Sequence, residues 1–274
     1  MLTSNLNFNF VGLKDINMRP VIGVIGNYFL VNDQYPVHTG GIMNGEALVN
    51  AAKCMPLIIP ADPHQVSIKE LQSYFDGFVF TGGRANVHPK EYGEPETDAH
   101  GFFDRGRDKI SIPLIRACVT SGQPFLGICR GFQEVAVAMG SSLHPEIRDI
   151  PGRDNHRMPP DGTLEQKFAL RHKVKIKKGG PFHRIFGSTQ VMTNTLHGQG
   201  IRVPGPRVVV EGVARDGTVE AIYIKDAPGF TLSVQWHPEY NAASDPVSRP
   251  LFEAFGAAAK AWQLRKTGQA LKFA

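Results

Sequence analysis

Apolar residues in the first half of the chain gather into short unbroken runs, and longer stretches with helical spacing lie between the runs. The runs occupy residues 20–26, 56–60, 77–80 and 125–128. Unbroken runs are typical of strands in a parallel sheet that is covered on both faces. The stretches with helical spacing are 41–54, 67–75 and 104–121. This alternation predicts an α/β fold with an open, mostly parallel sheet flanked by helices, of the flavodoxin-like type.

Two positions within the predicted helices carry local signals. Ser67 is followed three residues later by Glu70, the pattern of a capping box, which predicts a helix start at Ser67. Pro113 interrupts the stretch 104–121. Because proline lacks a backbone N–H and its ring clashes with the preceding turn, Pro113 predicts a kink or a break there.

The second half of the chain has a different pattern. Residues 144–163 are rich in Pro, Gly, Arg and His and show little periodicity. Short β-like runs separated by turn residues follow at 173–177, 190–193, 207–213, 219–224 and 230–235, and an amphipathic helix is predicted at 249–264. We therefore expect added β-strands in the C-terminal half. A single domain is predicted over 19–265, between tails at 1–18 and 266–274.

Composition excludes several classes of protein. The 274 residues are 42% hydrophobic, which is enough for a core, and the net charge is a modest +5. No basic stripe with interleaved aromatics occurs, so nucleic-acid binding is not predicted. No run approaches about 20 apolar residues, so no membrane span is expected. Three cysteines without C-x-x-C spacing predict no disulfide framework and a cytoplasmic location.

Cys129 is the first candidate for chemistry. It ends the apolar run 125–128, and Gly131 and a helical pattern follow it. A thiol between a strand and the positive end of a helix is favoured as thiolate. A lone cysteine after a strand is more often a small core residue, so Cys129 needs partners to be a nucleophile. Cys54 and Cys118 fall in helical apolar patterns and are expected to be inert core thiols.

Two other apolar runs end in groups that complete such a site. Gly83 follows the run 77–80, and His237 and Glu239 follow the run 230–235. The carboxyl ends of parallel strands meet at one edge of a sheet, so these groups are expected to meet Cys129 there. His237 would be the base and Glu239 would orient it. The backbone N–H groups of Gly83 and Arg130 would form an oxyanion hole.

The chain then resembles the class I glutamine amidotransferase-like family. The resemblance rests on segments 127–133 (GICRGFQ), 81–83 (TGG) and 237–239 (HPE), and it runs from about residue 20 to residue 262. It is closer to the gamma-glutamyl hydrolase branch of peptidase C26 type. Bacterial gamma-glutamyl-gamma-aminobutyrate hydrolases of putrescine breakdown are similar in segments 86–89 (NVHP), 92–93 (YG), 104–108 (DRGRD), 194–200 (NTLHGQG) and 234–239 (VQWHPE).

The resemblance implies a Cys-His-Glu hydrolase that cleaves the gamma-glutamyl amide of gamma-glutamyl-gamma-aminobutyrate through a thioester on Cys129. It implies that the glutamyl-binding cleft is lined by Gln133, Asn194, Thr195, Leu196 and His197. It implies no cofactor and a small gamma-glutamyl amine as partner. Many members carry a small or acidic residue after the double glycine, where this chain has Arg84. Arg84 is therefore a candidate for altered substrate choice.

Several alternatives stay open. Another gamma-glutamyl amine is an alternative substrate, because leaving-group pockets come from variable loops. A glutaminase subunit that passes ammonia to a partner and a non-enzymatic binding protein are alternative functions. A homo-oligomer is possible. The histidines of the loop 144–160, His144 and His156, lack tight ligand spacing, so we expect a solvated or lid-like loop and no metal site.

Overall fold

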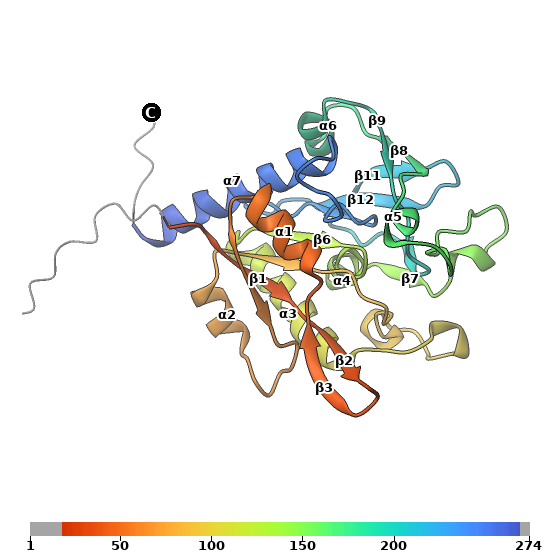
Figure 1. Cartoon of the computed structure of the whole chain (residues 1–274), viewed down its shortest axis with the longest axis horizontal. Coiled ribbons are helices and arrows are strands. Elements are labelled where there is room, and N and C mark those ends of the chain that lie inside the picture. Colours follow the sequence, from red (N-terminus) through yellow and green to blue (C-terminus); the bar gives the residue numbers. More distant parts are fainter. Residues whose placement is uncertain (1–17, 269–274) are drawn as a thin grey trace, which may run out of the picture.

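A nine-stranded mixed sheet organises the protein, whose computed structural model describes residues 18–268 (Figure 1). The strand order is β4-β1-β5-β6-β13-β12-β11-β8-β9. The parallel half consists of β4 (Met55–Ile59), β1 (Val21–Ile25), β5 (Gly77–Phe80), β6 (Phe125–Ile128) and β13 (Ser233–Val234). The antiparallel half consists of β12 (Val219–Ile224), β11 (Val208–Ala214), β8 (His172–Ile176) and β9 (Gln190–Thr193). The predicted α/β fold with a parallel core and added C-terminal strands is confirmed.

Helices cover both faces of the sheet. The longer ones are α1 (Ile42–Asn50), α2 (Ile68–Tyr74), α3 (Arg105–Ser121), α4 (Arg130–Ala138) and α7 (Ser248–Lys266). The short ones are α5 (Leu164–Lys167), α6 (Pro181–Phe186) and the single 3₁₀ turns Pro89–Tyr92, Asp98–His100 and Ile147–Asp149. Residues of α2, α3 and α4 share one hydrophobic cluster, and residues of α1, α6 and α7 share another. The sheet therefore lies between two apolar layers.

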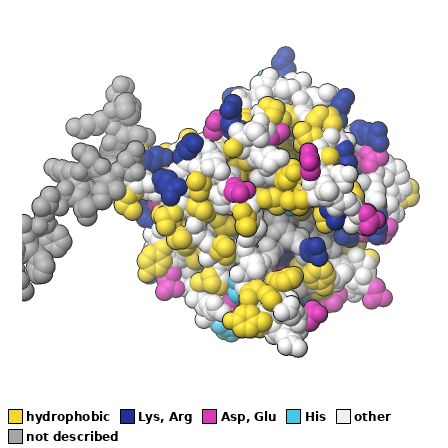
Figure 2. All heavy atoms as spheres, in the orientation of Figure 1, with side chains coloured by type: hydrophobic (Ala, Val, Ile, Leu, Met, Phe, Trp, Pro, Cys, Tyr) yellow, Lys and Arg dark blue, Asp and Glu magenta, His cyan; other side chains and the backbone are white. Residues whose placement is uncertain are grey.

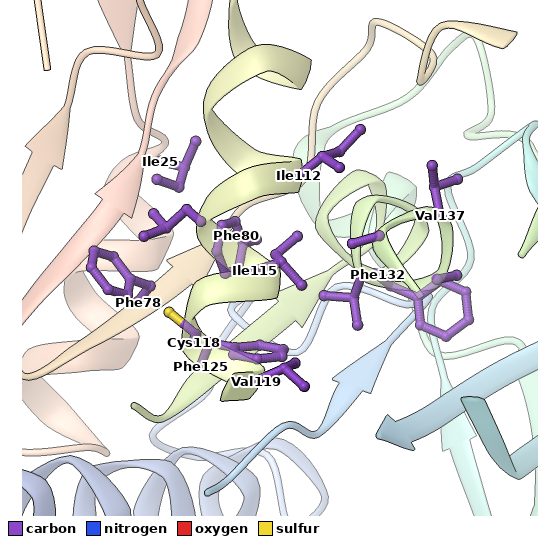
Figure 3. Close-up of a cluster of buried hydrophobic side chains, with 14 of the residues drawn as sticks. Ile25, Phe78, Phe80, Ile112, Ile115, Cys118, Val119, Phe125, Phe132 and Val137 are labelled. Atoms are coloured by element: carbon purple, nitrogen blue, oxygen red, sulfur yellow. The ribbon is translucent and has the colours of Figure 1, made fainter. Parts of the chain in front are cut away.

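The first of these layers is built on aromatic side chains of the parallel strands. Phe78, Phe80 and Phe125 are fully buried and pack with Ile115 of α3 and Phe132 of α4 (Figure 3). Burying a side chain of this size contributes about 1.5–3 kcal/mol. Because successive residues of a strand face opposite sides, Val79 between the two phenylalanines joins the other layer. This explains why the predicted strands are apolar at every position.

Two small sheets were not predicted from the sequence. β2 (Asn27–Val31) and β3 (Tyr35–Thr39) form a hairpin, and β7 (Ser142–His144) pairs with β10 (Gly200–Val203). The hairpin is exposed along most of its length, and hydrophobic side chains gather over it in Figure 2. Its strands therefore lack the one-sided burial that produces a readable alternation.

The predictions made from local sequence signals are confirmed at Ser67 but not at Pro113. The capping box is confirmed, since the Ser67 hydroxyl accepts from the backbone N–H of Glu70 and the Glu70 carboxylate accepts from that of Ser67. No break occurs at Pro113, because α3 runs through it with buried residues on both sides. Residues 230–235 contain a shorter strand than predicted, Ser233–Val234, although the carbonyl oxygens of Phe230 and Leu232 also accept from backbone N–H groups of β6.

The thiols of Cys54 and Cys118 are both buried, and one lies outside the element expected for it. Cys54 follows the end of α1 in the connection to β4, whereas Cys118 lies within α3 as expected. Burial raises the pKa of Cys54 to about 12 and also raises the pKa of Cys118. Both are therefore protonated at neutral pH, the weakly nucleophilic form.

The predicted tails lie mostly outside the described residues. Of the segment 1–18 only Met18 is described, and of the segment 266–274 only 266–268 are described. The last helix extends to Lys266, two residues beyond its predicted end. Within the described range, none of the helices is long and apolar enough to cross a bilayer.

Candidate active site

Three neighbouring parallel strands deliver the candidate residues to one edge of the sheet. β5 lies next to β6, and β6 lies next to β13. Thr81-Gly82-Gly83 follows β5, Cys129 follows β6, and His237 follows β13 by three residues. The Cys129 backbone N–H donates to the carbonyl oxygen of Val234, 2.9 Å away. The fold therefore brings these predicted residues to the same place.

Cys129 occupies a sharp turn between β6 and α4. Its φ of 50° and ψ of −103° are unusual for a residue with a side chain. Such a conformation costs on the order of 1–3 kcal/mol and is common at functional sites. Gly131 permits the turn, because a Cβ at this position would lie 1.9 Å from the carbonyl oxygen of Phe80. The thiol thus sits at the N-terminal end of α4, where the helix dipole favours negative charge.

His237 lies between the thiol and a carboxylate. Its Nδ1 is 2.7 Å from Oε1 of Glu239. Burial disfavours the imidazolium, but the negative charges of Glu239 and Cys129 outweigh burial and raise the pKa of His237 well above its usual value. The arrangement therefore favours a protonated imidazole beside Cys129, oriented by a carboxylate.

Two sets of contacts hold the imidazole in place. The side-chain amide of Asn194 donates to the His237 carbonyl oxygen at 2.9 Å and accepts from the His237 N–H at 2.8 Å. The Phe168 ring meets the imidazole edge-on, with centroids 5.6 Å apart, and stacks on Tyr240 at 4.7 Å. Phe168 and Tyr240 were missed in the sequence, since neither lies in a recognisable motif.

The loop after β5 lies against both His237 and the start of α4. A Cβ at Gly82 would fall 2.5 Å from Cε1 of His237. A Cβ at Gly83 would fall 3.1 Å from Cδ of Arg130. The two predicted oxyanion donors, the N–H groups of Gly83 and Arg130, therefore belong to adjacent residues in space. Arg84, the next residue of this loop, is exposed.

Four buried charged side chains lie beneath this loop and form what we call the charge cluster: Arg107, Asp108, Arg130 and Glu134. Arg107 contacts Glu134 through two nitrogens at 2.9 Å each, and Arg130 contacts both carboxylates, lying 2.6 Å from Asp108. Arg107 also donates to the Thr81 carbonyl at 2.5 Å, and Arg130 donates to the Ala85 carbonyl at 2.8 Å. The charge cluster therefore fixes the backbone of the loop that contains Gly82 and Gly83.

The residues expected to bind the glutamyl group are mostly buried. Gln133 donates to the carbonyl of Gln199 at 2.8 Å and to Oε1 of Gln235 at 3.1 Å. Thr195 and His197 contact a buried histidine, His156. Leu196 is half-buried. These contacts, together with those between Asn194 and His237, indicate that most of the residues predicted to bind the glutamyl group support the wall of the cleft.

A cavity of about 360 Å³ opens beside His237. Its lining includes Phe168, Asn194, Trp236 and Tyr240. The cavity lies next to the His237 imidazole. Aromatic and amide side chains on its wall suit a small organic molecule.

Comparison with known proteins shows the family of the chain. The Peptidase C26 family model matches residues 20–239. A gamma-glutamyl-gamma-aminobutyrate hydrolase of Escherichia coli K12, PuuD, is 36% identical over 89% of this chain and 94% of its own length. A putative glutamine amidotransferase of Schizosaccharomyces pombe is 32% identical over 81% of this chain and 83% of its own length.

Solved structures show the same fold. A putative GMP synthase component from Thermoplasma acidophilum superposes with a TM-score of 0.58 over 91% of this chain and 98% of its own, at 18% identity. At this identity the likeness concerns the fold alone. From the family match and the 36% identity, the chain belongs to the Peptidase C26 family of hydrolases, which has the class I glutamine amidotransferase fold.

Proposed function

We propose that the protein is a cysteine hydrolase that cleaves gamma-glutamyl amides. The observation that carries this proposal is the convergence of Cys129, His237 and Glu239, with the 2.7 Å contact between His237 and Glu239, at the carboxyl edge of adjacent parallel strands. A nucleophile, a base and an orienting group are then all available.

In the acylation step the Cys129 thiolate attacks the gamma-carbonyl carbon of the substrate. The carbonyl oxygen takes the negative charge, and the N–H groups of Gly83 and Arg130 stabilise it. When the intermediate collapses, the carbon–nitrogen bond breaks and the His237 imidazolium donates its proton to the leaving amine. A gamma-glutamyl thioester on Cys129 remains.

In the deacylation step neutral His237 accepts a proton from water, and the hydroxide attacks the thioester carbonyl. The carbon–sulfur bond breaks, glutamate leaves, and the thiolate and imidazolium are restored. Glu239 accepts from the Nδ1–H of His237 throughout and keeps the imidazole in one orientation.

We further propose gamma-glutamyl-gamma-aminobutyrate as the substrate, with 4-aminobutyrate leaving through the cavity beside His237. The name of the relative that is 36% identical supports this choice over a glutaminase function. Hydrolysis of this substrate would serve putrescine breakdown. A gamma-glutamyl derivative of another amine is the alternative, since Arg84 stands exposed in the loop after β5.

The test is glutamate release from gamma-glutamyl-gamma-aminobutyrate by the isolated chain. We expect release that is abolished in Cys129→Ala, and a mass increase on the Cys129 peptide after rapid acid quench with substrate. Comparing kcat/KM over a panel of gamma-glutamyl amines ranks the leaving groups. Cleavage of free glutamine without cleavage of any amine in the panel would show a glutaminase instead.

A further inference from the structure

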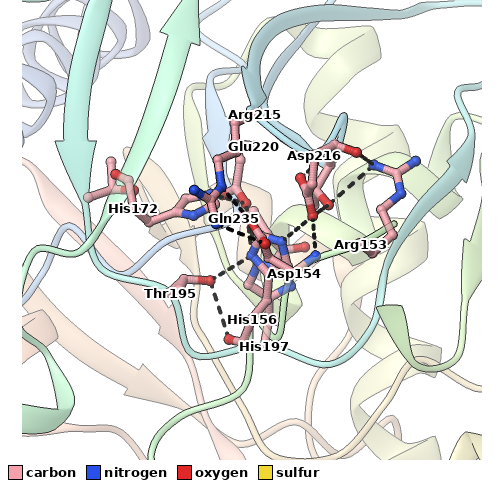
Figure 4. Close-up of polar contacts among 12 residues, drawn as sticks. Arg153, Asp154, His156, His172, Thr195, His197, Arg215, Asp216, Glu220 and Gln235 are labelled. Carbon is pink, nitrogen blue, oxygen red and sulfur yellow. Dashed lines mark hydrogen bonds and ion pairs between the residues drawn. The ribbon is translucent and has the colours of Figure 1, made fainter. Parts of the chain in front are cut away.

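A second cluster of titratable side chains lies outside the proposed catalytic residues. His156, His172, His197 and Glu220 are all buried and come from separate parts of the chain (Figure 4). His156 belongs to the loop before α5, His172 begins β8, His197 follows β9, and Glu220 lies on β12. We call this group the histidine cluster.

The nitrogens of all three histidines surround one carboxylate oxygen. Oε1 of Glu220 lies 3.2 Å from Nε2 of His172, 3.4 Å from Nε2 of His197 and 3.7 Å from Nδ1 of His156. Only the shortest of these is an ordinary hydrogen-bond length. Ligands of tetrahedral zinc bind at about 2.0–2.1 Å, which separates them from one another by roughly 3.3 Å. The distances from His197 and His156 fit ligands on a common ion, whereas the 3.2 Å contact of His172 is a hydrogen bond.

Hydrogen bonds on the far side of two imidazoles leave the inner nitrogens free to bind a cation. Nε2 of His156 lies 2.8 Å from Oδ2 of Asp216, and Nδ1 of His197 lies 3.1 Å from the Gln199 carbonyl oxygen. Both partners are acceptors, so both of these nitrogens carry hydrogen. Metal-binding histidines are held in this way by a carboxylate or a carbonyl on the outer nitrogen.

The inner atoms are poorly satisfied by protein groups. Within residues 18–268, Nε2 of His197 and Oε2 of Glu220 are buried and make no hydrogen bond. Nδ1 of His156 is 3.0 Å from the Thr195 hydroxyl, but that hydroxyl has a second acceptor in the His156 carbonyl oxygen at 3.3 Å. A cation at the centre can therefore bind Nδ1 while the hydroxyl keeps a hydrogen bond.

We propose that His156, His197 and Glu220 bind one zinc ion, and that His172 supports the site through its hydrogen bond to Glu220. The donor atoms of the first three all lie within 4.8 Å of one another. Two imidazoles and a carboxylate favour zinc over magnesium or calcium, which prefer oxygen ligands. No metal was expected because the histidines within the loop 144–160 lack ligand spacing, whereas these three ligands come from three separate segments.

The ion would stabilise the wall of the cleft. Thr195 and His197 are continuous with Asn194, which holds the His237 backbone, and the Glu220 carbonyl accepts from the Gln235 N–H at 2.8 Å. Zinc at this position links the loop before α5 to both segments. Its role is structural, since none of His156, His197 and Glu220 lines the cavity beside His237.

Metal content tests the proposal directly. Tag-free protein is prepared on a Cys129→Ala background, because Cys129 and His237 together could bind zinc themselves. After treatment with a chelating resin and re-addition of zinc, we expect roughly one tightly bound zinc per chain. His197→Gln and Glu220→Gln should each reduce the amount of bound zinc at least tenfold. His172→Gln should reduce it less. His64→Gln, at an exposed histidine, is the control and should change nothing.

Melting of the metal-free protein gives a second test that needs no variant of the cluster. Zinc at about 100 times its dissociation constant should raise the Tm by about 5–10 °C. Neither zinc content nor Tm depends on turnover, so these results stand apart from the proposed hydrolase activity. A protein that binds no zinc and shows no Tm shift would overturn the proposal and indicate a charged imidazole network. Unchanged zinc in His197→Gln and Glu220→Gln would also overturn it, as adventitious surface binding.

Discussion

The charge cluster and the histidine cluster both support the proposed site, but they balance their charges differently. In the charge cluster two guanidiniums face two carboxylates, and the three ion pairs have nearly complete burial. In the histidine cluster one carboxylate faces three imidazoles, and some buried atoms make no hydrogen bond within the described chain. Arginine stays protonated in proteins, whereas histidine exchanges its proton near neutral pH. The first cluster therefore has a fixed charge and the second an adjustable one.

This difference separates two ways of holding an active-site loop. The charge cluster anchors the loop after β5 through fixed donors that contact the carbonyls of Thr81 and Ala85. The histidine cluster anchors the segment after β9 through groups that respond to protons or a metal. We expect the removal of one charge from the charge cluster to lower the free energy of unfolding strongly. In the histidine cluster the loss should be smaller, because an imidazole can release a proton.

The largest effect is expected from removing one carboxylate of the charge cluster. Glu134→Gln leaves two buried guanidiniums facing only Asp108, and breaking a buried pair costs about 3–5 kcal/mol. Urea denaturation measures this loss in the free energy of unfolding. Glu253→Gln, which breaks an exposed pair with Arg249, should change stability by no more than about 0.5 kcal/mol.

Glu220→Gln, the matched substitution in the histidine cluster, should lower the free energy of unfolding less than Glu134→Gln does. With a chelator present, Glu220→Gln allows an imidazole to release its proton, so no uncompensated charge remains. The loss is then about 1–3 kcal/mol, from hydrogen bonds alone. Denaturation of both variants under one buffer makes the comparison. Equal costs for Glu134→Gln and Glu220→Gln would remove the distinction between the two clusters.

Arg107→Lys tests whether the charge cluster acts on the loop or only on stability. Lysine keeps the charge but loses the planar fork that contacts Glu134 and the Thr81 carbonyl together. Slight misplacement of Gly83 should lower kcat about 10- to 100-fold, with KM nearly unchanged. Arg116→Lys, on the exposed side of the same helix, is the control. A fall in stability with unchanged kcat would limit the cluster to a structural role.

The features that could be predicted from the sequence are those that leave a local pattern in it. Buried parallel strands appear as apolar runs, and Cys129 and His237 could be placed together because each follows such a run. Contacts between distant segments leave no period in the sequence, so the clamp of Asn194 on His237 and the grouping of His156 with His197 were missed. The exposed hairpin β2–β3 was missed for the opposite reason, since neither of its faces is buried enough to impose an alternation.

The smallest expected effect concerns the single carboxylate–imidazole pair of the proposed catalytic site. Glu239→Gln removes a negative charge that raises the pKa of His237, so that pKa should fall. The raised pKa of His237 stabilises the folded state at pH values below about 6.5, the usual pKa of histidine. This contribution is lost as the pH rises through the pKa that His237 has in the folded state. The variant should therefore lose most stability at neutral and acidic pH and approach the parent at alkaline pH. NMR titration of the imidazole, assigned by its absence in His237→Gln, measures the shift. An unchanged pKa would mean that Cys129 alone holds the proton on His237, and that Glu239 fixes only the orientation of the ring.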